Sequence, residues 1–139
     1  MNPGDSGNGS DIQPRTAFEL LGGQAVIDQL VDDFYDRMDA LPQAAKLRAI
    51  HAADLGPIRT LLKKYLGEWL GGPRRYTPER GTPMLRRRHQ PFDIDASARD
   101  AWMACMRQAL ASTCSDGALI AELEAAFDKV AAHLRNTVE

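Results

Sequence analysis

The residues with the clearest chemistry lie in the run Arg86-Arg87-Arg88-His89-Gln90-Pro91-Phe92. We expect His89 near the end of a short helix that Pro91 stops, because proline cannot continue a helix. Neutral imidazole is a strong ligand for iron, and the chain reversal after a helix end would hold it stiffly. A single histidine on a partly apolar helix is more often a surface or packing residue, so the rest of the chain must be weighed.

Length and composition indicate one globular domain. The chain has 139 residues, 44% of them hydrophobic, which is enough for one substantial core. Its formal net charge of -2 gives no electrostatic reason to expect nucleic-acid binding.

No apolar run reaches about 18 residues, so no membrane span is expected. The first residues lack a basic start followed by an apolar block, which argues against a secretory signal and favours a cytoplasmic location.

Two cysteines, Cys105 and Cys114, fall in one expected helix. Helix geometry separates them by roughly 13 Å along the axis and places them on opposite faces. They cannot bridge each other there, and we interpret them as reduced cysteines of a cytosolic protein.

The chain divides into a polar tail and one domain. Residues 1–15 are rich in Gly, Asn, Ser, Asp and Pro and have almost nothing to bury, so we expect a disordered N-terminal tail. Residues 16–139 form the expected domain, and no internal repeat is evident.

Apolar residues at helical spacing predict an all-α fold, and no convincing period-two alternation requires a strand. Capping residues and helix breakers predict where the helices begin and end. A first helix, 17–21, begins after Thr16 and ends at Gly22-Gly23, and Pro42 precedes a helix over 44–50. Asp54 and Pro57 begin a helix that Gly71-Gly72-Pro73 stops, Asp95 begins a long helix, and Asp116 begins the last one. A further helix covers 24–38, and a loop with Pro78, Gly81 and Pro83 precedes the short helix that ends at His89.

Most kinds of site are poorly supported. The chain has no Cys-x-x-Cys or His-Glu-x-x-His, and its three histidines are His51, His89 and His133. Covalent haem attachment would need Cys-x-x-Cys-His, and neither glycine pair forms a phosphate loop. One histidine beside a large apolar pocket suits haem, because haem brings four of its own ligands and needs only a fifth from the protein.

Beyond the tail, the chain resembles the truncated haemoglobins, specifically their second group. The run Leu85-Arg86-Arg87-Arg88-His89-Gln90-Pro91-Phe92, followed by Trp102 thirteen residues after its histidine, is highly specific. The other matching pieces are Gly22-Gly23, Phe34-Tyr35, Trp69-Leu70-Gly71-Gly72-Pro73, Tyr76, Gly81-Thr82-Pro83-Met84 and Arg99-Asp100-Ala101. The resemblance covers residues 18–136 and implies a truncated globin fold, a two-over-two helical sandwich around a non-covalent haem b.

The resemblance also implies roles around the iron. His89 matches the proximal iron ligand, and Tyr35 matches the distal tyrosine that hydrogen-bonds bound oxygen. Trp102 matches the tryptophan whose indole N–H points at the ligand in this group. His51 matches a position that the group fills with Tyr, His or Phe beside the ligand. Each of these residues also has a plainer interpretation. Tyr35 and Trp102 could be ordinary aromatic residues of the core, and His51 could lie in solvent at the end of a helix.

Other positions would surround the haem. Ile58 falls where full-length globins place their distal histidine, and Leu62, one turn on, would wall the distal pocket. Phe92 and Met106 match contributors to the surrounding core.

The haem edge shows one departure from the family pattern. Tyr76 and Arg88 match residues that commonly reach the haem propionates. Relatives often carry a basic residue where this chain has Leu61, and Lys63 or Lys64 could replace it only by reaching around the helix.

The resemblance implies reversible binding of O₂, with CO, NO or peroxide as other small ligands. Nitric-oxide detoxification or peroxidase-like turnover with an unidentified reductase is the related possibility, in which O₂ or peroxide is a substrate of a haem-dependent redox enzyme. A haem-free, globin-like interaction module is the third. We expect no nucleic-acid or membrane partner and either a monomer or a homodimer.

Removing residues 1–14 should leave haem content and thermal stability nearly unchanged. The segment has no large apolar side chain beyond Met1 and Ile12, so it offers little to pack. Melting curves and Soret absorbance of the shortened and full chains test this, and a large fall in melting temperature would mean that the tail docks on the domain.

Overall fold

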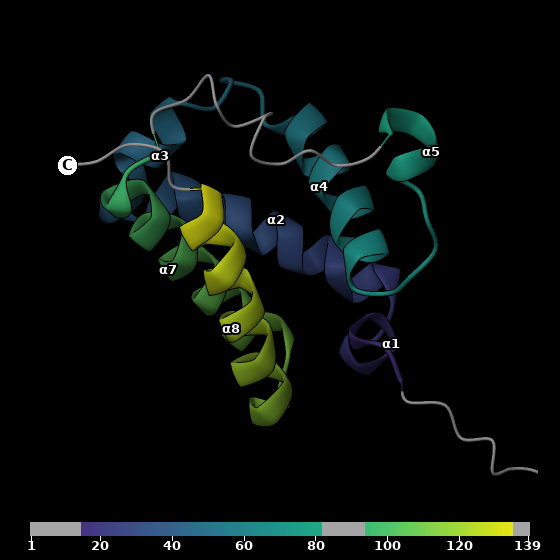
Figure 1. The fold of residues 1–139 in the computed structure, drawn as a ribbon. Coiled ribbons are helices and arrows are strands. Elements are labelled where there is room, and N and C mark those ends of the chain that lie inside the picture. Colours follow the sequence, from purple (N-terminus) through teal and green to yellow (C-terminus); the bar gives the residue numbers. More distant parts are fainter. Residues whose placement is uncertain (1–14, 82–93, 135–139) are drawn as a thin grey trace, which may run out of the picture.

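The computed structural model describes residues 15–81 and 94–134, and within these ranges it contains helices and no strands (Figure 1). The all-α prediction is therefore confirmed. In chain order the elements are α1 (Ala17–Leu21), α2 (Gln24–Ala40), the short 3₁₀ helix η1 (Pro42–Ala44), α3 (Ala45–Ala49), α4 (Gly56–Trp69), α5 (Thr77–Arg80), α7 (Ala96–Thr113) and α8 (Gly117–Leu134). The expected short helix before His89 and all but Arg15 of the expected tail lie outside the described residues.

Helix α2 is the centre of the fold. It packs against α7 along much of its length and also against α4, while α8 packs on α7. These four helices form two pairs, α2 with α4 and α7 with α8, as Figure 1 shows. The largest fully buried side chains all come from α2 and α7: Ile27, Leu30, Val31, Phe34 and Met38 from the first, Met103, Cys105, Met106 and Leu110 from the second. The core therefore lies at the α2–α7 interface.

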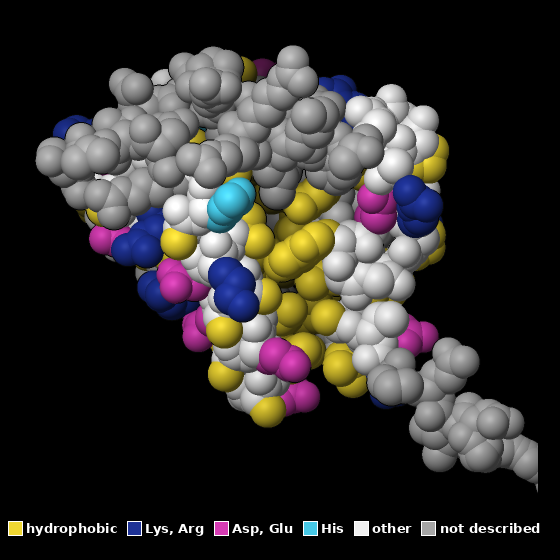
Figure 2. Space-filling view, viewed as in Figure 1, with side chains coloured by type: hydrophobic (Ala, Val, Ile, Leu, Met, Phe, Trp, Pro, Cys, Tyr) yellow, Lys and Arg dark blue, Asp and Glu magenta, His cyan; other side chains and the backbone are white. Residues whose placement is uncertain are grey.

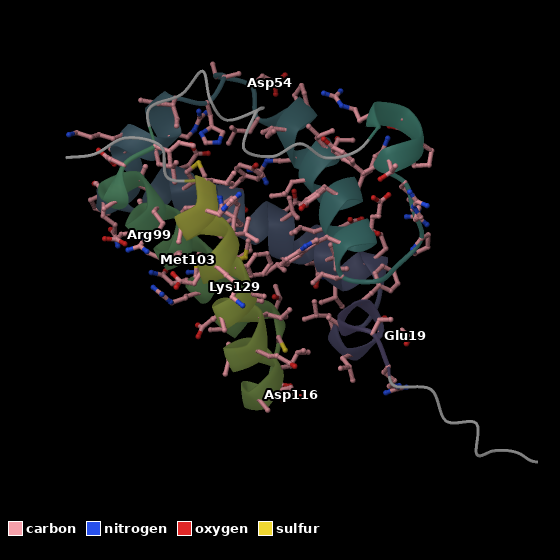
Figure 3. All side chains as sticks on the ribbon, in the orientation of Figure 1. Glu19, Asp54, Arg99, Met103, Asp116 and Lys129 are labelled. Carbon is pink, nitrogen blue, oxygen red and sulfur yellow. The ribbon has the colours of Figure 1, made fainter. Side chains whose placement is uncertain are left out.

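Polar side chains begin the helices where the sequence predicts. The Thr16 hydroxyl accepts a hydrogen bond from the backbone N–H of Glu19, and the Glu19 carboxylate accepts one from the backbone of Thr16, a reciprocal capping box. Asp95 caps α7 through the N–H of Ala98, and Asp116 accepts from two N–H groups at the start of α8. Glu19 and Asp116 are labelled in Figure 3 at the starts of their helices.

The glycines after α4 allow α1 to cross the end of that helix. The N–H of Phe18 donates to the carbonyl of Leu70 at 2.9 Å, which ties the two segments together. A Cβ on Gly72 would overlap the Phe18 ring and lie 2.8 Å from the carbonyl oxygen of Gly67. The close approach leaves no room for a side chain at this position.

Two local predictions are wrong. Pro78, predicted to break the chain into a loop, lies in the first turn of α5, where its missing N–H costs nothing. The Glu68 carboxylate of α4 caps this helix by accepting from the N–H and the hydroxyl of Thr77. Cys114 ends α7 as its C-cap rather than lying inside it, and Cys105 is buried within it. Neither cysteine is in a disulfide.

Gly72→Ala should destabilise the fold by about 1–3 kcal/mol, because its Cβ must push into the Phe18 ring and a fixed carbonyl. Gly117→Ala is the matched control: nothing lies within 4 Å of its added Cβ, so alanine should be neutral or slightly stabilising. Urea unfolding of both variants decides, and equal midpoints would contradict the steric argument.

Candidate functional site

Tyr35 places a buried phenol on the core side of α2. Its side chain is 3% exposed, and its ring meets the edge of Phe34 with the centroids 4.9 Å apart. Burial raises the pKa of Tyr35 well above its ordinary value, and the Arg59 charge offsets this only in part. The hydroxyl makes no hydrogen bond to any other described residue. At neutral pH it is therefore a protonated donor available to a ligand.

His51 follows α3 and lies beside Tyr35, with the ring centroids 6.1 Å apart. Its Nδ1 is 2.8 Å from the carbonyl oxygen of Leu47. A carbonyl only accepts, so Nδ1 carries the proton, and Nε2 of the neutral ring is then an acceptor. In this orientation Nε2 donates only when the imidazole is doubly protonated.

Trp102 is half-buried on α7 and belongs to the same aromatic cluster. Its ring lies 5.1 Å from that of Phe34 and 5.7 Å from that of Phe127, centroid to centroid. Phe34 therefore contacts both Tyr35 and Trp102. Sequence reasoning assigned Phe34 no role of its own, although it is the residue next to Tyr35 on a helix whose apolar stripe predicts burial.

One face of α4 presents apolar side chains that the core covers only in part. Ile58, Leu62 and Tyr65 recur at helical spacing, and each is half-buried against the core. Figure 2 shows hydrophobic side chains lining a depression in the molecular surface. A flat apolar group would cover more of this α4 face, so the described residues fit a haem ring.

Tyr76 precedes α5 and is buried, with its ring edge on Tyr65 at a centroid distance of 5.3 Å. The lysines that could compensate for Leu61 are engaged elsewhere. Lys63 pairs with Asp32 at 3.1 Å, and Lys64 pairs with Glu79 at 2.8 Å. Neither lysine is placed to serve a group on the apolar face without giving up its present partner.

The three remaining site assignments, His89, Arg88 and Phe92, lie outside the described residues and stay predictions. Met106, expected in the core, is fully buried, and His133, expected at the surface, is exposed. Within the described ranges, no three side chains from His, Cys, Asp and Glu gather in a way that could hold a metal ion. No helix in those ranges has the length and apolarity to cross a membrane.

A second hollow, of about 220 Å³, has a different character. Its lining residues are polar or charged, namely Gln24, Asp28, Thr60, Lys63, Lys64 and Arg75. It is smaller than typical cofactor sites, which reach about 300–1,000 Å³ and are mostly apolar. It does not suit a porphyrin.

Comparison with known proteins identifies the family. Residues 16–136 match the model of the bacterial-like globins. The chain is 38% identical over 117 residues to the group 2 truncated hemoglobin YjbI of Bacillus subtilis, covering 84% of this chain and 86% of that protein.

Solved structures agree. The group II 2-on-2 hemoglobin of Agrobacterium tumefaciens superposes with a TM-score of 0.88 at 39% identity, covering 93% of this chain and 99% of that one. The group II truncated hemoglobin of Bacillus anthracis gives 0.85 at 38% identity, with 92% and 96% covered. The chain thus belongs to the bacterial-like globins and, among them, to the group II truncated haemoglobins. Membership supports haem binding and the binding of small gas molecules as its class of function.

Proposed function

We propose that this protein holds a non-covalent haem b and reversibly binds O₂, with CO and NO as alternative ligands. His89 is the iron ligand that the protein supplies, and Tyr35, Trp102 and His51 surround the bound gas. The observation that carries the proposal is the buried, protonated Tyr35 phenol, which has no hydrogen-bond partner among the described residues. A phenol hydroxyl that no other described residue occupies is able to donate to a polar ligand at the iron.

When bound, haem supplies an iron atom with one coordination position open to a small gas molecule. The partly covered α4 face, with Ile58 and Leu62, would lie against the ring. Tyr76 and Arg88 would stand near the propionates, and Phe92 would add to the apolar surround. Of these side chains, Ile58, Leu62 and Phe92 would keep water from the faces of the ring.

The donors differ in how they act. Tyr35 and Trp102 each carry an N–H or O–H at any physiological pH, so they can donate to a gas ligand that acquires negative charge. His51 can donate from Nε2 only as imidazolium while Leu47 holds Nδ1. Tyr35 and Trp102 therefore provide the part of the stabilisation of the bound gas that does not depend on pH.

The polar side chains of Tyr35, Trp102 and His51 also favour a second candidate, a redox enzyme that consumes NO or peroxide and depends on a separate reductase. Spectra with and without dithionite establish whether haem is bound, and a missing Soret band would leave the haem-free interaction module. Rapid turnover of the oxygenated protein with NO, or of the ferric protein with peroxide, would favour the enzyme over the carrier.

Tyr35→Phe should speed O₂ dissociation, and the double variant with Trp102→Phe should speed it far more than either change alone. A hydrogen bond to a charged group is worth about 1.5–3 kcal/mol, so complete loss means roughly a ten- to hundredfold change. Trp102, or His51 when its ring is doubly protonated, can donate at the vacated position, which makes the effects non-additive. CO, which carries less charge when bound, should respond weakly. The test is to measure O₂ and CO dissociation by stopped flow from the wild type, the two single variants and the double variant. If the mutations change both dissociation rates equally, they alter the access of gases to the pocket rather than a hydrogen bond.

His89→Ala should lose most haem affinity or accept external imidazole in place of the side chain. His89 is the one histidine on the expected proximal segment. His133→Ala, which changes an exposed histidine of α8, is the control and should keep haem content and spectrum. An ordinary ferrous-oxygenated spectrum for His89→Ala without added imidazole would exclude the assignment.

A further inference from the structure

Arg59 joins α4 to α2 directly over Tyr35. Its Nη1 donates to the backbone carbonyl of Asp32 at 3.1 Å and to the Asp32 carboxylate at 3.0 Å. Its Nη2 donates to the carboxylate of Asp36 at 2.8 Å. The guanidinium carbon then lies 5.7 Å from the centroid of the Tyr35 ring.

The spacing of α2 explains this arrangement. Residues three and four apart are neighbours on a helix surface, so Tyr35 and Asp36 both lie one turn along α2 from Asp32. The guanidinium that binds both carboxylates therefore also lies close to the Tyr35 ring. Lys63 adds a second cation on Asp32 at 3.1 Å, which holds that carboxylate in place. The Arg59 side chain is 22% exposed, so solvent screens these contacts only in part.

We propose that Arg59 is a positioning residue for Tyr35: it fixes the phenol in the orientation that donates to the gas ligand and strengthens it as a donor. The inference rests on the proposed role of Tyr35. Phe34 packs edge-on at 4.9 Å and His51 lies 6.1 Å away, so three groups define the orientation of the ring. A cation near a phenol draws electron density from the hydroxyl, which makes its hydrogen a better donor.

The chain supplies a matched control in Arg37. This arginine also pairs with an aspartate of α2, Asp33, at 2.8 Å and also reaches another helix, through Gln108 of α7 at 2.9 Å. None of its contacts among the described residues is with an aromatic ring. Arg37→Met therefore removes a comparable helix-to-helix tie without touching Tyr35.

The experiment compares holoproteins carrying Arg59→Met, Arg59→Lys, Asp36→Asn, Arg37→Met and Tyr35→Phe. Three quantities are measured: the O₂ dissociation rate, the infrared stretching band of bound CO and the melting temperature. The CO band senses the direction and strength of nearby dipoles, so a purely structural tie does not move it.

Arg59→Met should speed O₂ dissociation by about three- to tenfold, less than Tyr35→Phe does, and should shift or split the CO band. Arg59→Lys keeps the positive charge but cannot contact both carboxylates at once. Its O₂ dissociation rate and its CO band should therefore lie between those of the wild type and those of Arg59→Met. Asp36→Asn loosens one anchor and should show a smaller change in the same direction. Arg37→Met should lower the melting temperature yet leave the CO band in place.

Two outcomes overturn the inference alone: a wild-type O₂ rate and CO band in Arg59→Met and Asp36→Asn, or the same changes in Arg37→Met as in Arg59→Met. If Tyr35→Phe itself leaves both quantities unchanged, the proposed role of Tyr35 fails and the inference fails with it. Should Arg59→Met not yield folded protein, Asp36→Asn and Arg59→Lys test the same inference, and wild-type values in both would overturn it.

Discussion

The burial of α2 against α7 is the contact on which the site depends. Phe34 is fully buried in that interface and contacts Tyr35 from its own helix and Trp102 from the other. Burying one large apolar side chain stabilises a fold by about 1.5–3 kcal/mol, and eight such side chains from these two helices are almost completely covered, together with Cys105. The two constant donors of the proposed site are thus held by the same packing that holds the domain together.

Helix α4 is attached to this core both by apolar packing and by ion pairs. Leu66 is buried in the core, while Ile58, Leu62 and Tyr65 are only half covered. The ion pairs of Arg59 with Asp32 and Asp36 add to this packing. Partly exposed ion pairs each stabilise a fold by at most about 1 kcal/mol. They do little for stability, but they fix geometry, because a guanidinium bound at several points allows few orientations. One wall of the proposed pocket is therefore fixed by packing, and the other by packing together with ion pairs.

Much of this could be predicted from the sequence, since local chemistry decides it. Thr16, Asp95 and Asp116 begin helices because their side chains satisfy free N–H groups nearby in the chain. The start of α5 was not predictable in this way, because its cap is Glu68 of another helix. In the site, the resemblance indicated Tyr35, Trp102 and His51. It did not indicate Arg59, whose partner Asp32 lies 27 residues away, because such a contact depends on how two helices cross.

The tautomer of His51 shows how the fold can separate constant from adjustable interactions. The carbonyl of Leu47 holds the proton on Nδ1, so the ring presents an acceptor toward its other side when neutral and a donor when charged. Tyr35 has no such choice near neutral pH, because burial raises its pKa far beyond that range. The Tyr35 and His51 rings lie 6.1 Å apart, centroid to centroid. The Tyr35 hydroxyl is therefore a donor throughout the neutral pH range, whereas Nε2 of His51 changes from acceptor to donor when the ring gains one proton.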